Sequence, residues 1–218
     1  MQTLLMFLML GVNFWISWSN ARCVGKYWSE SKEVGGSFRR LVVCGYVMAV
    51  AGFTMVYGYL LLIVAPYIFQ AMGYSHSFVT QLQSLSADLI YLLVGASVIL
   101  SGFRITAHSL RGAWEQKSFS YIANAGWNSY AQIHNVVNYA RSAPSAFGRI
   151  VKALFGGSGK KSRSKDENSA YIAFLAILIV VLALLGGYFT ADAIMKRADA
   201  EYDAFDVAVR AREAEGSA

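Results

Sequence analysis

The chain has 218 residues, a formal net charge of +6 at pH 7 and 56% hydrophobic residues. This apolar share is above that of ordinary globular domains, which argues against a water-soluble protein and makes lipid the expected solvent. The two cysteines, Cys23 and Cys44, are too few for the disulfide framework of a small secreted domain. The basic residues gather beside apolar segments. Membrane insertion alone explains that placement, so nucleic acid is not an expected partner.

Four apolar runs predict four transmembrane helices, because about 20 apolar residues span a hydrocarbon core of about 30 Å. They cover residues 1–18, 41–69, 85–103 and 170–191. The first run is expected to remain as an uncleaved anchor, since its removal would turn the most basic connector outward. The sequence thus predicts an all-α, multi-pass membrane protein.

The connectors between these runs differ sharply in charge. Residues 19–40 hold five basic and two acidic side chains, and residues 104–169 hold ten basic and three acidic ones. Residues 70–84 hold no charged side chain, and the tail 192–218 holds four basic and seven acidic ones. Because basic connectors stay in the cytoplasm, these charges predict that both termini are extracytoplasmic and both basic connectors are cytoplasmic.

Two polar residues fall inside the predicted spans. Asn13 lies well within the first span, and an amide at that depth is expected to face another helix. Asp88 precedes Arg104 by sixteen residues, about 24 Å of helix, so its carboxylate lies partly inside the hydrocarbon. A buried carboxylate needs a partner or water. We expect an ion pair with Lys196 or Arg197 near the outer surface; a hydrated Asp88 without a partner is the alternative.

The cytoplasmic connector 104–169 contains an amphipathic helical pattern that Pro144 is expected to end. One stripe of this pattern is apolar, and the opposite stripe consists of uncharged amides. A helix on a membrane surface usually carries Lys or Arg on its polar face, so the pattern favours docking to a partner protein. The residues predicted to take part are Asn124, Asn128, Gln132, Ile133, Asn135, Val137 and Asn138.

The same connector ends in a glycine- and serine-rich hinge and a basic cluster. The cluster consists of Lys160, Lys161, Arg163 and Lys165. Cations just before a span attract anionic lipid, and enforcement of topology is the competing explanation. The acidic tail 192–218 also has an apolar face, which predicts an extracytoplasmic helix that extends the last span and can associate with itself.

No constellation of side chains indicates catalysis, a cofactor or a metal ion, and the three histidines have no ligand partners at suitable spacing. We therefore expect a protein of the bacterial inner membrane that is not an enzyme. It would be an integral subunit or accessory factor of a bacterial, phage or mobile-element envelope complex, such as a secretion or conjugation machine, acting by protein–protein interaction. Its expected partners are membrane lipid and other subunits, in a homo- or hetero-oligomer. The alternative is a small oligomeric channel or membrane-potential effector, in which several copies surround an axis and a polar path is lined by Asn13, Thr54, Asp88, Ser97 and Ser101.

Overall fold

The computed structural model describes residues 2–155 and 163–216, and every element in these ranges is an α-helix. In chain order they are α1 (Gln2–Lys26), α2 (Trp28–Val34), α3 (Gly36–Ala71), α4 (His76–Gln116), α5 (Phe119–Phe155) and α6 (Arg163–Gly216). Five are long, and α2 has only seven residues. The predicted all-α fold is therefore confirmed for the described part of the chain.

Short breaks separate the helices where the backbone needs glycine or a cap. Gly35 and Gly36 have positive φ angles of 65° and 55°, and they divide α2 from α3. Gly73, with φ 85°, lies in the turn between α3 and α4, and Ser75 caps α4 by accepting a hydrogen bond from the Phe78 amide. Because the breaks before and after α4 are short, α4 packs as an antiparallel pair with α3 and with α5.

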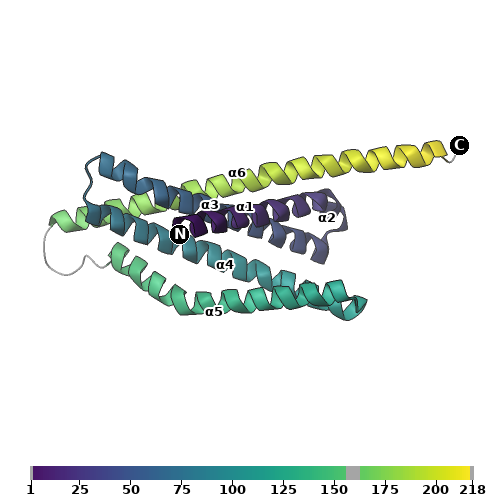
Figure 1. Cartoon of the computed structure of the whole chain (residues 1–218), viewed down its shortest axis with the longest axis horizontal. Helices are drawn as coiled ribbons and strands as arrows, with labels where there is room; N and C mark the ends of the chain where they lie inside the picture. Colours follow the sequence, from purple (N-terminus) through teal and green to yellow (C-terminus); the bar gives the residue numbers. More distant parts are fainter. Residues whose placement is uncertain (1, 156–162, 217–218) are drawn as a thin grey trace.

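The five long helices form an up-and-down bundle, in which successive long helices run antiparallel (Figure 1). One end holds the α3–α4 turn, where the Tyr74 ring stacks on Tyr171 of α6 with 6.4 Å between ring centroids. We call it the Tyr74 end. The opposite end holds α2, where the Ser29 backbone amide and hydroxyl both donate to the Asp199 carboxylate of α6. We call it the Ser29 end.

The path of residues 104–169 differs from the sequence prediction, which kept this connector at one end of the bundle. α4 finishes at the Ser29 end, where Arg104 donates to the Ser37 hydroxyl at 2.7 Å, whereas the apolar part of α6 starts at the Tyr74 end. α5 joins them by running back along α4 (Figure 1). The prediction was wrong because it relied on hydropathy, and α5 is not among the helices that qualify as spans by hydropathy.

Small residues mark the places where helices cross. A Cβ added at Gly187 of α6 would lie 2.6 Å from the Thr54 backbone nitrogen of α3, closer than real Cβ atoms come. Nearby, the fully buried Ala21, Ala49 and Ala191 bring α1, α3 and α6 together. Without larger side chains between them, the backbones approach closely, which is how membrane helices gain packing energy.

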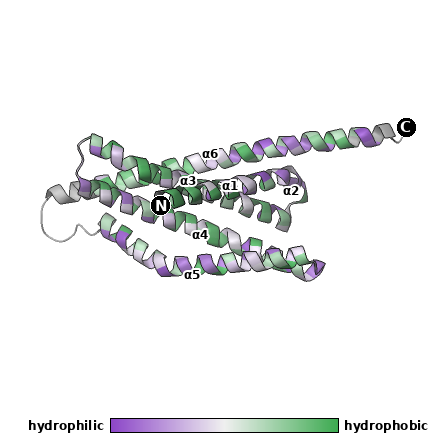
Figure 2. Ribbon diagram, in the orientation of Figure 1, coloured by the Kyte–Doolittle hydropathy of each residue, from purple (hydrophilic) through white to green (hydrophobic). Residues whose placement is uncertain are grey.

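The outside of the bundle is apolar. Four helices are long and apolar enough to cross a membrane, within α1, α3, α4 and α6. Figure 2 shows hydrophobic residues along these helices, and Leu100, Phe174 and Phe189 are 74%, 61% and 62% exposed. The predicted spans lie within the same four helices, apart from residue 1, which is outside the described residues. Such a surface suits lipid, so the chain has the architecture of a multi-pass membrane protein.

α6 is longer than the bundle that it helps to form. It leaves α1 at Glu201, which pairs with Arg22 at 3.1 Å, and at Tyr202, whose ring centroid lies 4.9 Å from the Lys26 ammonium. Beyond this point α6 projects past the Ser29 end (Figure 1), and Phe205 is 66% exposed. The predicted helical extension of the last span is therefore present.

Candidate functional site

Side chains of α5 hold it along α4 by bonding to the α4 backbone. Gln132 is buried, and its Nε2 donates to the Ile99 carbonyl at 2.7 Å. The Tyr139 hydroxyl donates to the Leu92 carbonyl at 3.1 Å. Because these donors reach carbonyls of the neighbouring helix, the polar stripe of α5 is turned toward α4.

Glycines on α4 make this close approach possible. A Cβ at Gly95 would collide with the Tyr139 ring, and a Cβ at Gly102 would collide with the Gln132 amide. Near the Ser29 end, the Asn128 amide donates to the Ser109 hydroxyl at 2.7 Å. α5 is therefore packed against α4 over most of its length.

The residues predicted to dock a partner do not form one surface. Gln132 is buried against α4 and Asn135 lines a cavity inside the bundle, whereas Ile133 and Val137 point away from the bundle and are 65% and 41% exposed. Asn124 is exposed, and its side chain accepts a hydrogen bond from Asn128. On α5, Gln132 and Asn135 are thus turned toward the bundle, whereas Ile133 and Val137 are turned away from it.

An ion pair joins α4 and α5 near the Tyr74 end. Arg149 donates through Nε to Asp88 Oδ2 at 2.7 Å and through Nη2 to Asp88 Oδ1 at 2.6 Å. The Asp88 side chain is only 11% exposed, while Arg149 is 54% exposed and also donates to the Ser145 hydroxyl. This bidentate geometry satisfies the carboxylate that the sequence places within a span.

The predicted pairing of Asp88 with Lys196 or Arg197 is therefore wrong. Lys196 pairs with Asp192 at 2.8 Å, and Arg197 pairs with Glu201 at 2.9 Å, each one helical turn away on α6. Both cations lie toward the Ser29 end, because Met195 beside them packs with residues of α1 and α3 near α2. The error follows from the path of α6, which runs in the opposite direction to the one predicted.

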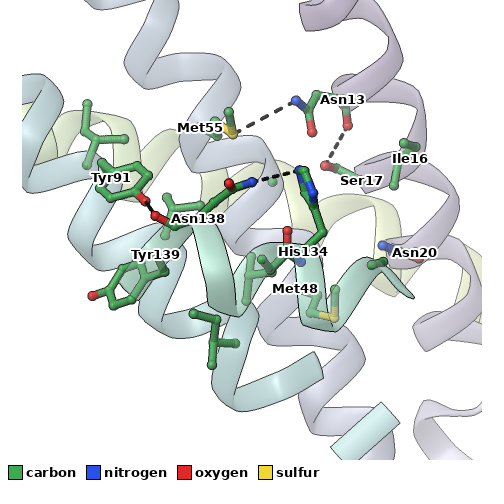
Figure 3. Close-up of a pocket in the computed structure, with 18 of the residues that line it drawn as sticks. Asn13, Ile16, Ser17, Asn20, Met48, Met55, Tyr91, His134, Asn138 and Tyr139 are labelled. Atoms are coloured by element: carbon green, nitrogen blue, oxygen red, sulfur yellow. Dashed lines mark hydrogen bonds between the residues drawn. The ribbon is translucent and has the colours of Figure 1, made fainter. Parts of the chain in front are cut away.

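A groove of about 740 Å³ opens between α1 and α5. Its floor is formed by α3 and α4, and no described Cα atom of α1 comes within 8 Å of one on α5. Figure 3 shows side chains from both walls converging on it. We call this cavity the α1–α5 groove; the amides and imidazole that line it are Asn13, Asn20, Asn128, His134, Asn135 and Asn138.

The polar side chains in the α1–α5 groove have few partners. Asn13 faces α3, where its Nδ2 lies 4.0 Å from the Met55 sulfur, a long contact for a weak acceptor. On the other wall, Asn138 Nδ2 and His134 Nε2 lie 2.7 Å apart (Figure 3). The groove therefore offers hydrogen-bonding groups without formal charge, above a floor that is largely apolar.

Part of the predicted site lies outside the residues described. Lys160 and Lys161 fall there, and the placement of the Arg163 and Lys165 side chains is not described either. Among the residues that the structure does describe, no group of three or more His, Cys, Asp or Glu side chains could hold a metal ion. The groove is therefore the candidate site, and its chemistry is hydrogen bonding and apolar contact.

Sequence reasoning missed that α5 spans the length of the bundle. A signal for it exists, because the 22 residues from Phe119 to Ala140 contain no Lys, Arg, Asp or Glu. Such a helix is about 33 Å long, enough for a hydrocarbon core of about 30 Å. The groove had no comparable signal, since it depends on how far apart α1 and α5 are held.

Comparisons with known proteins give no match for this chain among protein-family models, curated proteins or solved structures.

Proposed function

We propose that this chain is an integral protein of the bacterial inner membrane that acts by assembly, as a subunit or accessory factor of an envelope complex such as a secretion or conjugation machine. The observation that carries the proposal is the continuation of α6 beyond the bundle. Residues 203–216 form about 21 Å of helix beyond Tyr202, whose ring lies near Lys26 of α1. A lone helix of this length is marginally stable in water, so a partner protein that covers it would stabilise it.

The face of α6 that packs on α1 is the face we assign to the partner. Ala198 is buried against α1 beside Gly25. Phe205 and Val209 follow at helical spacing on the same side, while Val207 lies on the opposite side. An apolar face that continues beyond its intramolecular partner is suited to an intermolecular one.

We further propose that α5 crosses the membrane as a fifth span. Three observations support this: α5 joins opposite ends of the bundle, its uncharged stretch is long enough to cross, and its apolar stripe points outward. A helix whose amides face the protein and whose apolar side faces lipid can cross despite a low mean hydropathy. Five crossings put the two termini on opposite sides.

The orientation that we propose follows from the same rule of charges. With five spans, twelve of the 19 Lys and Arg residues belong to segments on the Ser29 side, and the other seven lie within residues 141–165. The larger number of Lys and Arg residues on the Ser29 side favours a cytoplasmic Ser29 end. The N-terminus is then extracytoplasmic, and the projecting helix of α6 is cytoplasmic.

Crosslinking in cells tests the assembly role. Full-length protein is crosslinked in bacterial cells, solubilised in detergent, and its covalent adducts identified by mass spectrometry. We expect Phe205→Asp to remove a defined adduct, because it puts a charge on the partner face. Val207→Asp adds the same charge to the opposite face of the same segment and should leave the adduct in place. Equal loss from both variants, or no adduct at all, would contradict the proposal.

A further inference from the structure

The α1–α5 groove is long. Its floor follows α3 from Gly45 to Leu62, a rise of about 26 Å along the helix. An extended apolar chain can lie along that length.

The lining of the groove selects an uncharged ligand. None of the described residues that line it is Lys, Arg, Asp or Glu. A charged head group at this depth would have no countercharge, which is costly inside hydrocarbon. Along the floor, Met48, Met55 and Val94 provide apolar contact for a tail.

Asparagine side chains on both walls of the groove have few hydrogen-bond partners. The side chains of Asn135 and Asn20 line the groove and form no hydrogen bond with another residue that the structure describes. Asn13 has only its long contact to the Met55 sulfur. An amide carries two N–H donors and a carbonyl acceptor, and leaving them unpaired away from water costs free energy. A ligand with carbonyl oxygens on two opposite edges would accept from both walls at once.

Aromatic side chains in the groove favour a flat head group. The rings of Tyr91 and Tyr139 stack with 5.7 Å between centroids and 26° between planes, and both line the groove together with Trp127. Offset stacking on such rings stabilises planar π-systems.

We propose that the α1–α5 groove binds an isoprenoid quinone: a neutral, planar ring with two opposed carbonyl oxygens and one apolar tail. The amides of Asn13 and Asn135 donate to the two carbonyls from opposite walls, and the tail lies along α3. The ligand enters sideways from the bilayer, where α1 and α5 are not in contact. This site rests on the proposed membrane embedding of α5, and it is independent of the assembly role of α6.

Quenching of tryptophan fluorescence by a para-benzoquinone with a decyl tail tests the site, because Trp127 lines the groove. The full-length protein is titrated in detergent micelles. We expect saturable quenching, weakened about threefold to tenfold by Asn13→Leu or Asn135→Leu, the loss expected for one hydrogen bond. Asn124→Leu is the matched control, since Asn124 lies on α5 outside the groove. Ala131→Phe fills the groove and should abolish saturation while the protein stays helical by circular dichroism.

Several outcomes would overturn the proposal. One is linear, unsaturable quenching of the wild-type protein; another is unchanged affinity in both asparagine variants and in Ala131→Phe. A decanoyl monoacylglycerol has the same tail length without the planar ring, and equal competition by it would assign the groove to acyl chains instead. Phe205→Asp should leave quinone binding unchanged, so failure of the assembly role and failure of this site are distinguishable. Cysteine labelling of α5 checks its embedding separately.

Discussion

Asp88 of α4 and Arg149 of α5 form a two-point ion pair, with nitrogen–oxygen distances of 2.7 and 2.6 Å, although 61 residues separate them in sequence. Arg149 lies beyond Pro144 on α5. The sequence predicts that Pro144 ends the helix, but Pro144 lies inside α5 and the helix continues past it. Proline in a helix interior produces a kink, and α5 bends toward α4 in this part (Figure 1). The bend brings the guanidinium to the carboxylate.

Removing one partner of this pair should destabilise the protein more than removing both. Asp88→Asn leaves Arg149 without its countercharge, and Arg149→Gln leaves a carboxylate that is 11% exposed without one. We expect each single variant to lower the melting temperature in detergent, and the double variant to recover part of that loss. Arg197→Gln is the control, because Arg197 pairs with Glu201 on its own helix. Strictly additive effects would mean that the two residues are not coupled.

Cysteines at the two ends of α5 should be labelled from opposite sides of the membrane. In a variant with Cys23 and Cys44 replaced by serine, Lys152→Cys should react with an impermeant maleimide in spheroplasts, as Ser77→Cys should. Lys117→Cys should react only after lysis. The reason is that Lys117 precedes α5 and Lys152 lies in the last turn of α5, which runs the length of the bundle. Labelling of both α5 positions from one side would return residues 104–169 to a single compartment.

Charges on the outward stripe of α5 should prevent its insertion. Ile133 and Val137 are exposed on the side that we assign to lipid, and an Asp near the middle of a span costs about 2.5–3.5 kcal/mol. We expect the variant with Ile133→Asp and Val137→Asp to lose resistance to alkaline extraction, or to be degraded. Val207→Asp, in the projecting part of α6, should behave like the wild type. Normal insertion of the double variant would indicate that this stripe faces water.

A methyl group at the α3–α6 crossing should be poorly tolerated. Gly187→Ala places a Cβ against the Thr54 backbone, which cannot move aside as a flexible side chain can. Overpacking of this kind costs about 1–3 kcal/mol, so we expect a lower melting temperature and earlier loss of helical signal on heating in detergent. Gly11→Ala is the matched control, because nothing lies within 4 Å of a Cβ there. Equal behaviour of the two variants would contradict the close backbone approach.

The apolar spans could be predicted from the sequence because hydropathy depends only on local composition. Runs 41–69 and 170–191 fall within α3 and α6, the two most apolar of the four candidate spans. The bounds were less accurate, since helices continue past the hydrocarbon: α4 reaches Gln116, well beyond the predicted end at residue 103.

The role of α5 and the partner of Asp88 could not be predicted in the same way. A hydropathy scale scores Gln132 and Asn128 as side chains that favour water, whereas their amides donate hydrogen bonds to α4. The choice between Arg149 and a cation of α6 depends on which end of the bundle each helix occupies. That depends on the path of α5, which returns along α4 to the Tyr74 end. The unpredicted return of α5 reversed the predicted direction of α6 and changed the predicted ion pair with it.

The inward amides of α5 also bear on how the chain is made. A segment that does not qualify as a span by hydropathy is a poor substrate for insertion on its own, because its amides would meet lipid before they meet α4. The hydrogen bonds of Gln132 and Tyr139 to α4 carbonyls would let the two helices leave the translocation channel as one preassembled hairpin. If α5 crosses the membrane as proposed, synthesis of α6, which is apolar enough to span by itself, would then fix that hairpin in place. Biogenesis of this protein is therefore expected to depend on the order in which its helices emerge, with α5 held until α4 is beside it.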